Sequence, residues 1–335
     1  MHIKLITHAS HIYGLGHLSR SRVIAEQFID NGYGVEIVEL DVALHLVQAL
    51  DRSLHEQTLI VIDLDPRFWE ALYQTFRNYI LEKGSLTAWH IFIFDDPRFM
   101  VRNLIARSFE NVTYLNPYQD KVAQFGSDTV SGFNYFPFTK YLLEIRERNL
   151  EYFSFSQIAI TCGGSDPHGL TNTYLNLLNL YNEEILNVSI FIGPLFDTNN
   201  ISTLKQEAYI SMHKIDFVTQ EEYSATLFEK SGLVLTTGGL TRYELALCGI
   251  PFVTLNFDPV QDVTSNMFEK NGASIHLGQH SQRQSNLRRN FHNSLKKILA
   301  HEDVRIEMGR RGRNLFNKSD FNLAARMVNL MNNAR

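Results

Sequence analysis

The chain has 335 residues, of which 44% are hydrophobic and 20% are charged, and its formal net charge is −5. This composition is typical of a globular protein large enough for two domains, and the acidic balance argues against nucleic acid as the main partner. No hydrophobic run is long enough to cross a membrane, and the N-terminal residues lack the pattern of a signal peptide. We therefore expect a cytoplasmic protein without a transmembrane segment.

The N-terminal half alternates between apolar runs and helical patterns. Parallel strands need crossover connections, so this alternation indicates an α/β protein with a parallel sheet. The predicted strands cover residues 3–7, 35–40, 59–63 and 91–94, and the predicted helices cover 17–31, 66–82 and 97–108.

Residues 132–155 break this rhythm with many aromatic side chains and mixed charges. Aromatic residues packed between two domains explain this segment better than a membrane or acceptor surface does. The strand–helix alternation then restarts, so we expect two Rossmann-like domains with ligand binding in the cleft between them, at the carboxyl ends of the strands. The predicted division is residues 1–138, a linker at 139–155, and residues 156–335 with helical terminal segments; the strands of the second domain are predicted at 157–161, 188–192, 215–218, 233–236 and 252–255, with a helix at 170–182.

Residues 236–249 (T-T-G-G-L-T-R-Y-E-L-A-L-C-G) predict an anion-binding turn. A buried strand leads through two glycines into a helix that Thr241 is expected to cap, and a helix N-terminus attracts phosphate through its N–H groups and its dipole. Glu244 lies about one turn inside this helix, where it can reach a sugar hydroxyl just beyond the phosphate. The pattern favours a nucleotide, although the glycines alone could simply tighten a strand-to-helix turn.

A second Gly-rich loop, Y-G-L-G-H-L-S-R, leaves the first strand. Gly14 and Gly16 permit a tight turn, and His17 then lies at a helix N-terminus, which disfavours the imidazolium and leaves the ring able to accept a proton. Arg20 lies on the same helix face. The third glycine of a dinucleotide fingerprint is missing. The alternative is that His17 only caps the helix.

Two further segments add polar groups to the second domain. The loop C-G-G-S-D-P-H-G-L-T again joins a strand to a helix through paired glycines, and it can line the other side of a pyrophosphate or sugar. Polar side chains follow the strand at 252–255; they suit sugar hydroxyls, and equally a solvated loop or helix cap: Asn256, Asp258, Gln261 and Asn266.

Acidic residues end two strands of the first domain, and they raise the question of a metal. Asp63, Asp65, Asp95 and Asp96 could face the cleft, but acids at strand ends are often helix caps. Cys162 and Cys248 lie in apolar or Gly-rich segments and are expected in the core rather than in a disulfide or zinc site. We therefore expect no metal and no other cofactor.

Together these motifs resemble those of the UDP-sugar hydrolases of pseudaminic acid synthesis and the related spore-coat polysaccharide proteins. More widely, the chain resembles the peptidoglycan N-acetylglucosaminyltransferase, which has the two-domain glycosyltransferase-B architecture. The resemblance covers most of the chain and rests on G-L-G-H-L-S-R, I-T-C-G-G-S-D-P-H-G-L-T, I-G-P-L-F, T-G-G-L-T-R-Y-E-L-A-L-C-G-I-P-F-V and a later Q…N…G-A-S segment.

The resemblance implies roles for several residues. His17 would activate the water that attacks the sugar, Glu244 would bind the ribose, and the turn before it would bind diphosphate. The hydrolases tend to carry Asp-x-Tyr where this chain has Asp63-Leu64-Asp65, so Asp65 stands in the tyrosine's place. The expected catalytic residues are His17 and Asp65; the expected nucleotide-binding residues are Gly163, Gly164, Ser165, Thr237, Gly238, Gly239, Leu240, Thr241 and Glu244; and the expected substrate-binding residues are Gly14, Gly16, Arg20, Arg242, Asn256, Gln261 and Asn266.

The expected activity is hydrolysis of a UDP-sugar in surface-glycan biosynthesis. The alternative is glycosyl transfer from a UDP-sugar to an acceptor hydroxyl with the same base, and a rival from another class is a non-catalytic nucleotide-sugar-binding subunit. The expected partner is the UDP-sugar, with a glycan or lipid-linked acceptor as a further partner of the transfer reaction.

Overall fold

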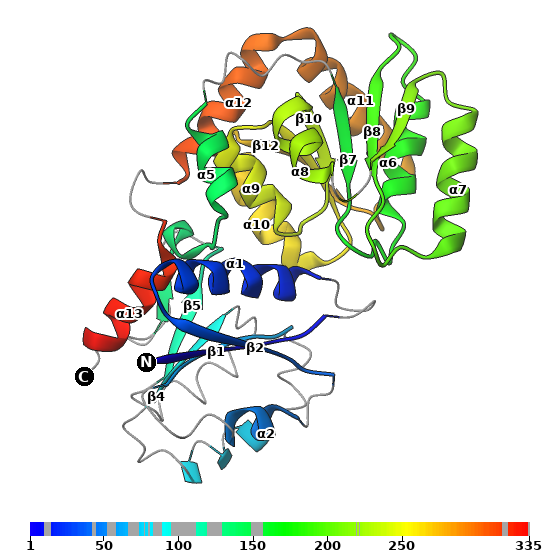
Figure 1. Cartoon of the computed structure of the whole chain (residues 1–335). Helices are drawn as coiled ribbons and strands as arrows, with labels where there is room; N and C mark the ends of the chain where they lie inside the picture. Colours follow the sequence, from blue (N-terminus) through cyan, green and yellow to red (C-terminus); the bar gives the residue numbers. More distant parts are fainter. Residues whose placement is uncertain are drawn as a thin grey trace. The chain divides into compact units, whose positions relative to one another are not determined.

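The computed structural model divides into two compact units, which are coloured along the chain in Figure 1. Unit 1 comprises Met1–Phe138 and Asn317–Arg335, and unit 2 comprises Thr139–Phe316. Each contains a six-stranded parallel sheet, so the expected α/β class with parallel sheets is confirmed. The structure describes residues 1–9, 15–41, 45–51, 58–65, 74–76, 78–79, 81–82, 89–94, 112–118, 129–148, 157–218, 220, 222–316 and 321–333.

In unit 1 the strands lie in the order β2-β1-β3-β4-β5-β6. The chain starts at β1, continues to β2 on one side and then crosses to β3 on the other. Connections therefore diverge between β1 and β3, and such a switch point opens a crevice at the carboxyl ends of the strands. The bounds are β1 His2–Thr7, α1 Gly16–Asp30, β2 Gly34–Glu39, α2 His45–Asp51, β3 Thr58–Asp63, β4 Trp89–Phe94, β5 Val112–Asn116, β6 Thr129–Ser131 and α13 Leu323–Asn333.

Both faces of this sheet are buried, which explains the continuous apolar runs of its central strands. Alternate residues of β3 point to opposite faces: Ile60 and Ile62 belong to the core beneath α2, while Leu59 and Val61 pack in the core beneath α1. The first four strands match the predicted ones. Strands β5 and β6 were not predicted, because β6 has only three residues and β5 carries polar residues. The helix predicted at 97–108 and most of that at 66–82 lie outside the described residues.

The C-terminal helix joins unit 1, whereas the sequence analysis grouped residues 156–335 together. Helix α13 packs against α1 (Figure 1), and its Leu323, Met327 and Met331 are buried in the same core as Phe28 of α1. The expected linker also differs: part of it forms α5 (Lys140–Arg146), which packs against a helix of unit 2. Periodicity predicts that a helix is amphipathic, but it does not identify the sheet that the apolar face covers.

In unit 2 the strand order is β12-β11-β10-β7-β8-β9, so the switch point lies between β7 and β10. The loops that follow these two strands are the two Gly-rich segments of the second domain. Strand β12 was not predicted, because it lies at the sheet edge and only Ser274 and Leu277 of its residues are buried. The bounds are β7 Ile158–Thr161, α6 Leu170–Asn179, β8 Asn187–Phe191, α7 Thr198–Tyr209, β9 Lys214–Val218, α8 Tyr223–Ala225 with a π-helical turn Thr226–Lys230, β10 Leu233–Thr236, α9 Thr241–Cys248, β11 Phe252–Asn256, α10 Pro259–Lys270, β12 Ser274–Gln279, α11 Gln284–Ala300 and α12 Glu302–Asn314.

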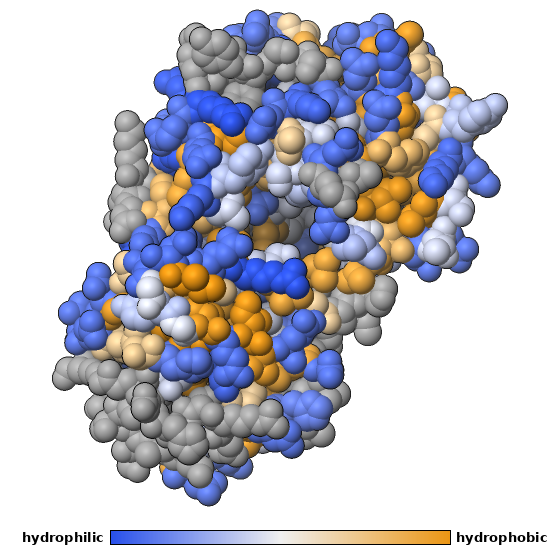
Figure 2. Space-filling view, viewed as in Figure 1, coloured by the Kyte–Doolittle hydropathy of each residue, from blue (hydrophilic) through white to orange (hydrophobic). Residues whose placement is uncertain are grey.

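The surface carries side chains of both kinds. Figure 2 shows hydrophilic residues over much of the visible face, interrupted by smaller hydrophobic areas. Within the part of the chain that the structure describes, no helix combines the length and the hydropathy that a membrane span requires.

Candidate functional site

In unit 1, His17, Arg20 and Asp63 form a cluster at the switch point of the sheet. Asp63 is the last residue of β3, and His17 and Arg20 lie in the first turns of α1, which the chain enters after β1. Nδ1 of His17 lies 2.6 Å from Oδ1 of Asp63. Arg20 donates from Nε to Oδ2 of Asp63 at 2.6 Å and from Nη2 to Oδ1. The side chain of His17 is 12% exposed, whereas that of Asp63 is fully buried.

These contacts determine which nitrogen of His17 carries the proton. Nδ1 also lies 3.2 Å from Nη2 of Arg20, but a guanidinium can only donate. The shorter contact with the carboxylate requires Nδ1 to be the donor, so in the neutral ring Nε2 is the nitrogen that can accept a proton. The ring of His8 stacks on that of His17 with centroids 5.0 Å apart.

The Asp63 carboxylate is ionised at neutral pH. Burial by itself would raise the pKa of Asp63, but the charges and hydrogen bonds of Arg20 and His17 outweigh burial and lower the pKa to about 2. A fixed, ionised carboxylate on Nδ1 holds an imidazole in one tautomer and stabilises the imidazolium that forms when Nε2 takes a proton.

The structure alters two assignments from the sequence. The acid beside His17 is Asp63, the first member of the Asp63-Leu64-Asp65 segment, and Asp65 is buried two residues further on. Arg20 is 3% exposed, and its guanidinium lies over the rings of Phe94 and Tyr118. Its contacts with Asp63 favour support of the acid over the expected contact with substrate. Gly16 is the first residue of α1, whereas Gly14, Asp95 and Asp96 lie outside the described residues.

In unit 2, the loop after β7 is closed by its own carboxylate. The two oxygens of Asp166 accept hydrogen bonds from the amides of Leu170 and Thr171, each at 2.8 Å, and thereby cap α6. The amide of Leu195 donates to the carbonyl of Gly164 at 2.9 Å. The N-terminus of α6 is therefore already occupied by protein groups, and the binding of a nucleotide by Gly163, Gly164 and Ser165 stays a prediction.

The turn after β10 is built differently, because no side chain caps α9. The expected cap at Thr241 is wrong: Leu240 is the N-cap residue, and Thr241 already lies in the helix. The amides of this first turn are thus available to an anion. Gly238 has no space for a side chain, since an added Cβ would lie 2.4 Å from Cβ of Gln261, whereas Gly239 is exposed.

Glu244 lies three residues beyond Thr241, on the same face of α9. Burial raises the pKa of this carboxyl group to about 7. No described residue forms a hydrogen bond or ion pair with it, so a ligand hydroxyl would be its first donor.

Sequence reasoning missed Tyr223, which adjoins the same turn. Its side chain forms hydrogen bonds with Thr161 at the end of β7 and with Thr241. Burial, followed by the nearby Glu244, raises the pKa of this phenol to about 12. Tyr223 follows no glycine-rich turn and belongs to no motif, so only the fold reveals its position.

Two residues that were expected to bind the substrate, Arg242 and Asn256, instead form hydrogen bonds with α10. Arg242 is 4% exposed and donates to the carbonyl of Gln261 at 3.0 Å and to Oγ of Ser265 at 2.6 Å. Asn256 is fully buried and donates to Asp262 and to Ser265. These contacts tie β11 and α9 to α10, which differs from the expected exposure to a sugar.

Gln261 and Asn266, two further residues expected to bind substrate, both lie on α10. Gln261 lies against Gly238, and its Oε1 has no hydrogen-bond partner among the described residues. Asn266 is exposed. The structure therefore brings Gln261 to the Gly-rich turn, and it records no contact of Asn266 with the turn.

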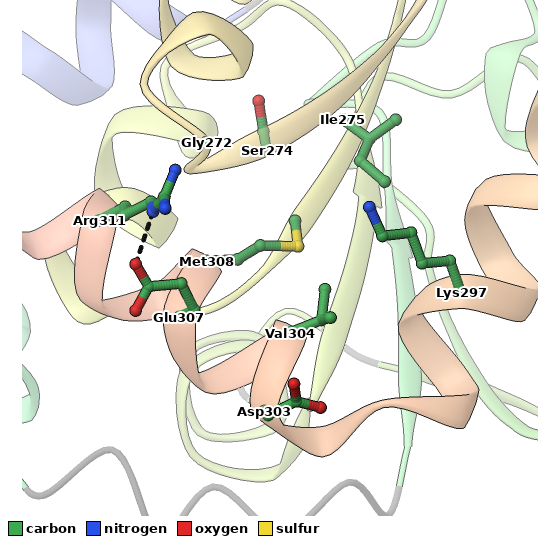
Figure 3. Close-up of a pocket in the computed structure, with 9 residues that line it drawn as sticks. All are labelled: Gly272, Ser274, Ile275, Lys297, Asp303, Val304, Glu307, Met308 and Arg311. Carbon is green, nitrogen blue, oxygen red and sulfur yellow. Dashed lines mark hydrogen bonds and ion pairs between the residues drawn. The ribbon is translucent and has the colours of Figure 1, made fainter.

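A separate pocket of about 320 Å³ lies elsewhere in unit 2 (Figure 3). Gly272 and Ser274, at the start of β12, line one part of it, and Glu307 and Arg311 of α12, which form an ion pair, line another. None of the expected site residues line it. Among the described residues, no group of three or more His, Cys, Asp or Glu could hold a metal ion.

Comparison with known sequences gives one partial match and no family. No family model matches the chain. An uncharacterised protein of Methanocaldococcus jannaschii is 25% identical over 178 residues, which are 53% of this chain and 36% of that protein. The chain thus spans about a third of the length of this curated relative.

Solved structures match nearly the whole chain. They include MurG of Acinetobacter baumannii (TM-score 0.64, 15% identity, 99% of this chain and 100% of that one). MnaA of Staphylococcus aureus with UDP has a TM-score of 0.63 at 10% identity and covers 98% of this chain and 95% of that one. HepE of Anabaena with UDP has a TM-score of 0.61 at 11% identity and covers 99% of this chain and 100% of that one. With two parallel six-stranded sheets matched over its length, the chain has the glycosyltransferase-B fold.

Proposed function

We propose that this protein is a UDP-sugar hydrolase that cleaves the anomeric C–O bond with water and releases UDP. The observation that carries the proposal is the His17–Asp63 pair, in which the carboxylate holds Nδ1 and leaves Nε2 as the proton acceptor. Two of the similar structures contain UDP, which supports this nucleotide as the ligand.

Unit 2 would hold the nucleotide. The uncapped first turn of α9 supplies N–H groups and a positive dipole end for the diphosphate, and Glu244 accepts hydrogen bonds from the ribose. The same helix end stabilises the negative charge that develops as UDP leaves, so the step needs no cofactor. The proposed nucleotide-binding residues are Gly163, Gly164, Ser165, Thr237, Gly238, Gly239, Leu240, Thr241 and Glu244.

The proposed reaction is a single displacement. Nε2 of His17 takes a proton from water, the water oxygen attacks the anomeric carbon, and the bond from that carbon to the β-phosphate oxygen breaks with its electron pair on UDP. Attack from the side opposite the leaving group inverts the anomeric configuration. Asp63 orients the ring throughout, and a catalytic contribution from Asp65 stays a prediction.

Glycosyl transfer is the second candidate, since the glycosyltransferase-B fold suits it equally and His17 can deprotonate an acceptor hydroxyl in the same way. In either case we propose a role in surface-glycan biosynthesis in the cytoplasm, with a glycan or lipid-linked acceptor as partner if transfer occurs.

UDP release from a panel of UDP-sugars, measured with and without acceptor alcohols, tests the proposal. Release without acceptor, with retention of activity after dialysis against a chelator, supports hydrolysis. Release only with acceptor supports transfer. Absence of release together with UDP binding would favour a non-catalytic binding subunit.

A further inference from the structure

We propose that Arg20 is a positioning residue: its guanidinium clamps Asp63 so that one carboxylate oxygen serves His17, and it shares the charge of that carboxylate with the imidazole. This inference rests on the proposed role of His17 as the base. Arg20 was expected to contact the substrate, but the contacts of this buried side chain favour a different role.

The hydrogen bonds between Arg20, Asp63 and His17 show how the carboxylate is held. Nε of Arg20 holds Oδ2 of Asp63, while Nη2 of Arg20 and Nδ1 of His17 meet at Oδ1. A guanidinium fork is planar, so two parallel hydrogen bonds fix the plane of the carboxylate as well as its position. Oδ1 is thereby held toward Nδ1, and the imidazole is held in the tautomer that catalysis requires.

The clamp also limits the charge that His17 meets. Arg20 and Asp63 together are close to neutral, so the imidazolium formed during the reaction faces an ion pair instead of a bare carboxylate. An unshared carboxylate would bind the imidazolium more strongly and make proton release slower. Besides Asp63 from β3 and Arg20 from α1, the described groups that face this cluster include the stacked ring of His8, which follows β1, and the ring of Tyr118 over the guanidinium.

Lysine should not replace arginine here. The guanidinium lies 5.2 Å from the ring centroid of Phe94 and 5.6 Å from that of Tyr118, which places a flat cation against aromatic side chains. An ammonium group would supply the charge, but it would hold only one oxygen at a time and leave the carboxylate free to turn.

The test is direct observation of the His17 imidazole by long-range ¹H–¹⁵N NMR, which does not depend on knowing the substrate. In the wild type we expect Nδ1 to carry the proton of the neutral ring. In Arg20→Met the share of the neutral ring that is protonated at Nδ1 should fall, because the carboxylate of Asp63 is no longer held toward Nδ1. The share in Arg20→Lys should fall between those of the wild type and Arg20→Met, since an ammonium group holds one oxygen at a time. Arg22→Met, an exposed position on the same helix, is the matched control and should leave the tautomer ratio unchanged.

Arg20→Met leaves a buried carboxylate without its cation, and this variant could fail to fold. A second comparison therefore uses Asp63→Asn with and without Arg20→Met. If Arg20 acts through Asp63, removal of Arg20 from the Asp63→Asn protein should leave the tautomer ratio of His17 unchanged. A change there, or a wild-type tautomer ratio in folded Arg20→Met and Arg20→Lys, would overturn the proposal.

Turnover separates this inference from the proposed function. If the NMR changes occur as described but no UDP-sugar is turned over by the wild type, the clamp stands and the proposed reaction fails. If the wild type hydrolyses a UDP-sugar, Arg20→Lys should lower kcat with little change in KM, since the proposed nucleotide contacts lie in unit 2. Equal turnover by Arg20→Lys and the wild type would count against the clamp.

Discussion

Gly238 lies directly against Gln261, so that a Cβ at position 238 would come within 2.4 Å of Cβ of Gln261. The neighbouring Gly239 is exposed, and an added Cβ there would meet only Oγ1 of Thr237, at 3.7 Å. The two glycines of one turn therefore serve different needs: Gly238 lets α10 approach, and Gly239 leaves the outer side of the turn open.

Substitution of each glycine by alanine should distinguish a packing role of Gly238 from a ligand-binding role of Gly239. Gly238→Ala should destabilise unit 2 by about 1–3 kcal/mol, because the extra methyl overpacks the contact with Gln261. Gly239→Ala should keep wild-type stability and lose UDP affinity, since its methyl would face the proposed diphosphate. Chemical denaturation and calorimetric UDP titration measure the two effects, and equal stability of both variants would contradict the packing argument.

Glu244 should dominate nucleotide affinity. Its carboxyl group has no partner among the described residues, so ribose hydroxyls would be its first donors. Loss of this charge-assisted hydrogen bond in Glu244→Ala should cost about 1.5–3 kcal/mol of UDP binding. Because the pKa of Glu244 is raised to about 7, wild-type affinity should also increase between pH 6 and 8 more steeply than that of Glu244→Gln. Titrations in which the two proteins show the same pH dependence would place the ribose elsewhere.

The same carboxyl group should affect stability in the absence of ligand. Its folded pKa, about 7, exceeds its ordinary value of 4.5, so folding favours the protonated form, and stability is lost as pH rises from about 4.5 to about 7. Glu244→Gln cannot ionise. It should match the wild type near pH 4 and exceed it at pH 8 by at most about 3 kcal/mol. A wild type that is as stable as the variant at pH 8 would show that the carboxyl group is better solvated than its surroundings indicate.

Asp63 should show the opposite pH dependence. Its folded pKa of about 2 lies below its ordinary value of 3.8, so it stabilises the fold above pH 4, and this stability is lost as pH falls toward 2. The difference in unfolding free energy between the wild type and Asp63→Asn should therefore be constant above about pH 5 and shrink by about 2 kcal/mol at lower pH. A difference that does not depend on pH would mean that the ion pair with Arg20 is not formed in solution.

The sequence predicted most of the fold because central parallel strands are continuous apolar runs, as in Leu59–Asp63 and Leu233–Thr236. It missed β6 and β12, where shortness or edge exposure removes that signal. It also grouped α13 with the wrong neighbours, since amphipathic periodicity does not encode which sheet a helix covers.

The site was predictable in the same uneven way. Chain order alone places the Gly-rich turn after β10 and the helical positions of His17 and Glu244, whereas the roles of these two residues stay predictions. The choice between Asp63 and Asp65 does not, because both carboxylates lie near the end of β3 and only the path of α1 determines which one meets His17. Arg20 and Arg242 are residues of a type that often binds anionic ligands. In the fold both side chains are buried, and they donate hydrogen bonds to neighbouring protein groups instead.

His17 should contribute to turnover and little to nucleotide binding. It lies in unit 1, whereas the proposed nucleotide contacts all lie in unit 2. General-base catalysis typically contributes about 10²–10⁴-fold, so His17→Gln should lose turnover by a factor in that range and keep its UDP affinity. If His17 only supports α1, the variant should instead be less stable and turn over normally per folded molecule. Turnover, UDP affinity and melting temperature of one preparation distinguish the two, and a stable His17→Gln protein with wild-type turnover would reject His17 as the base.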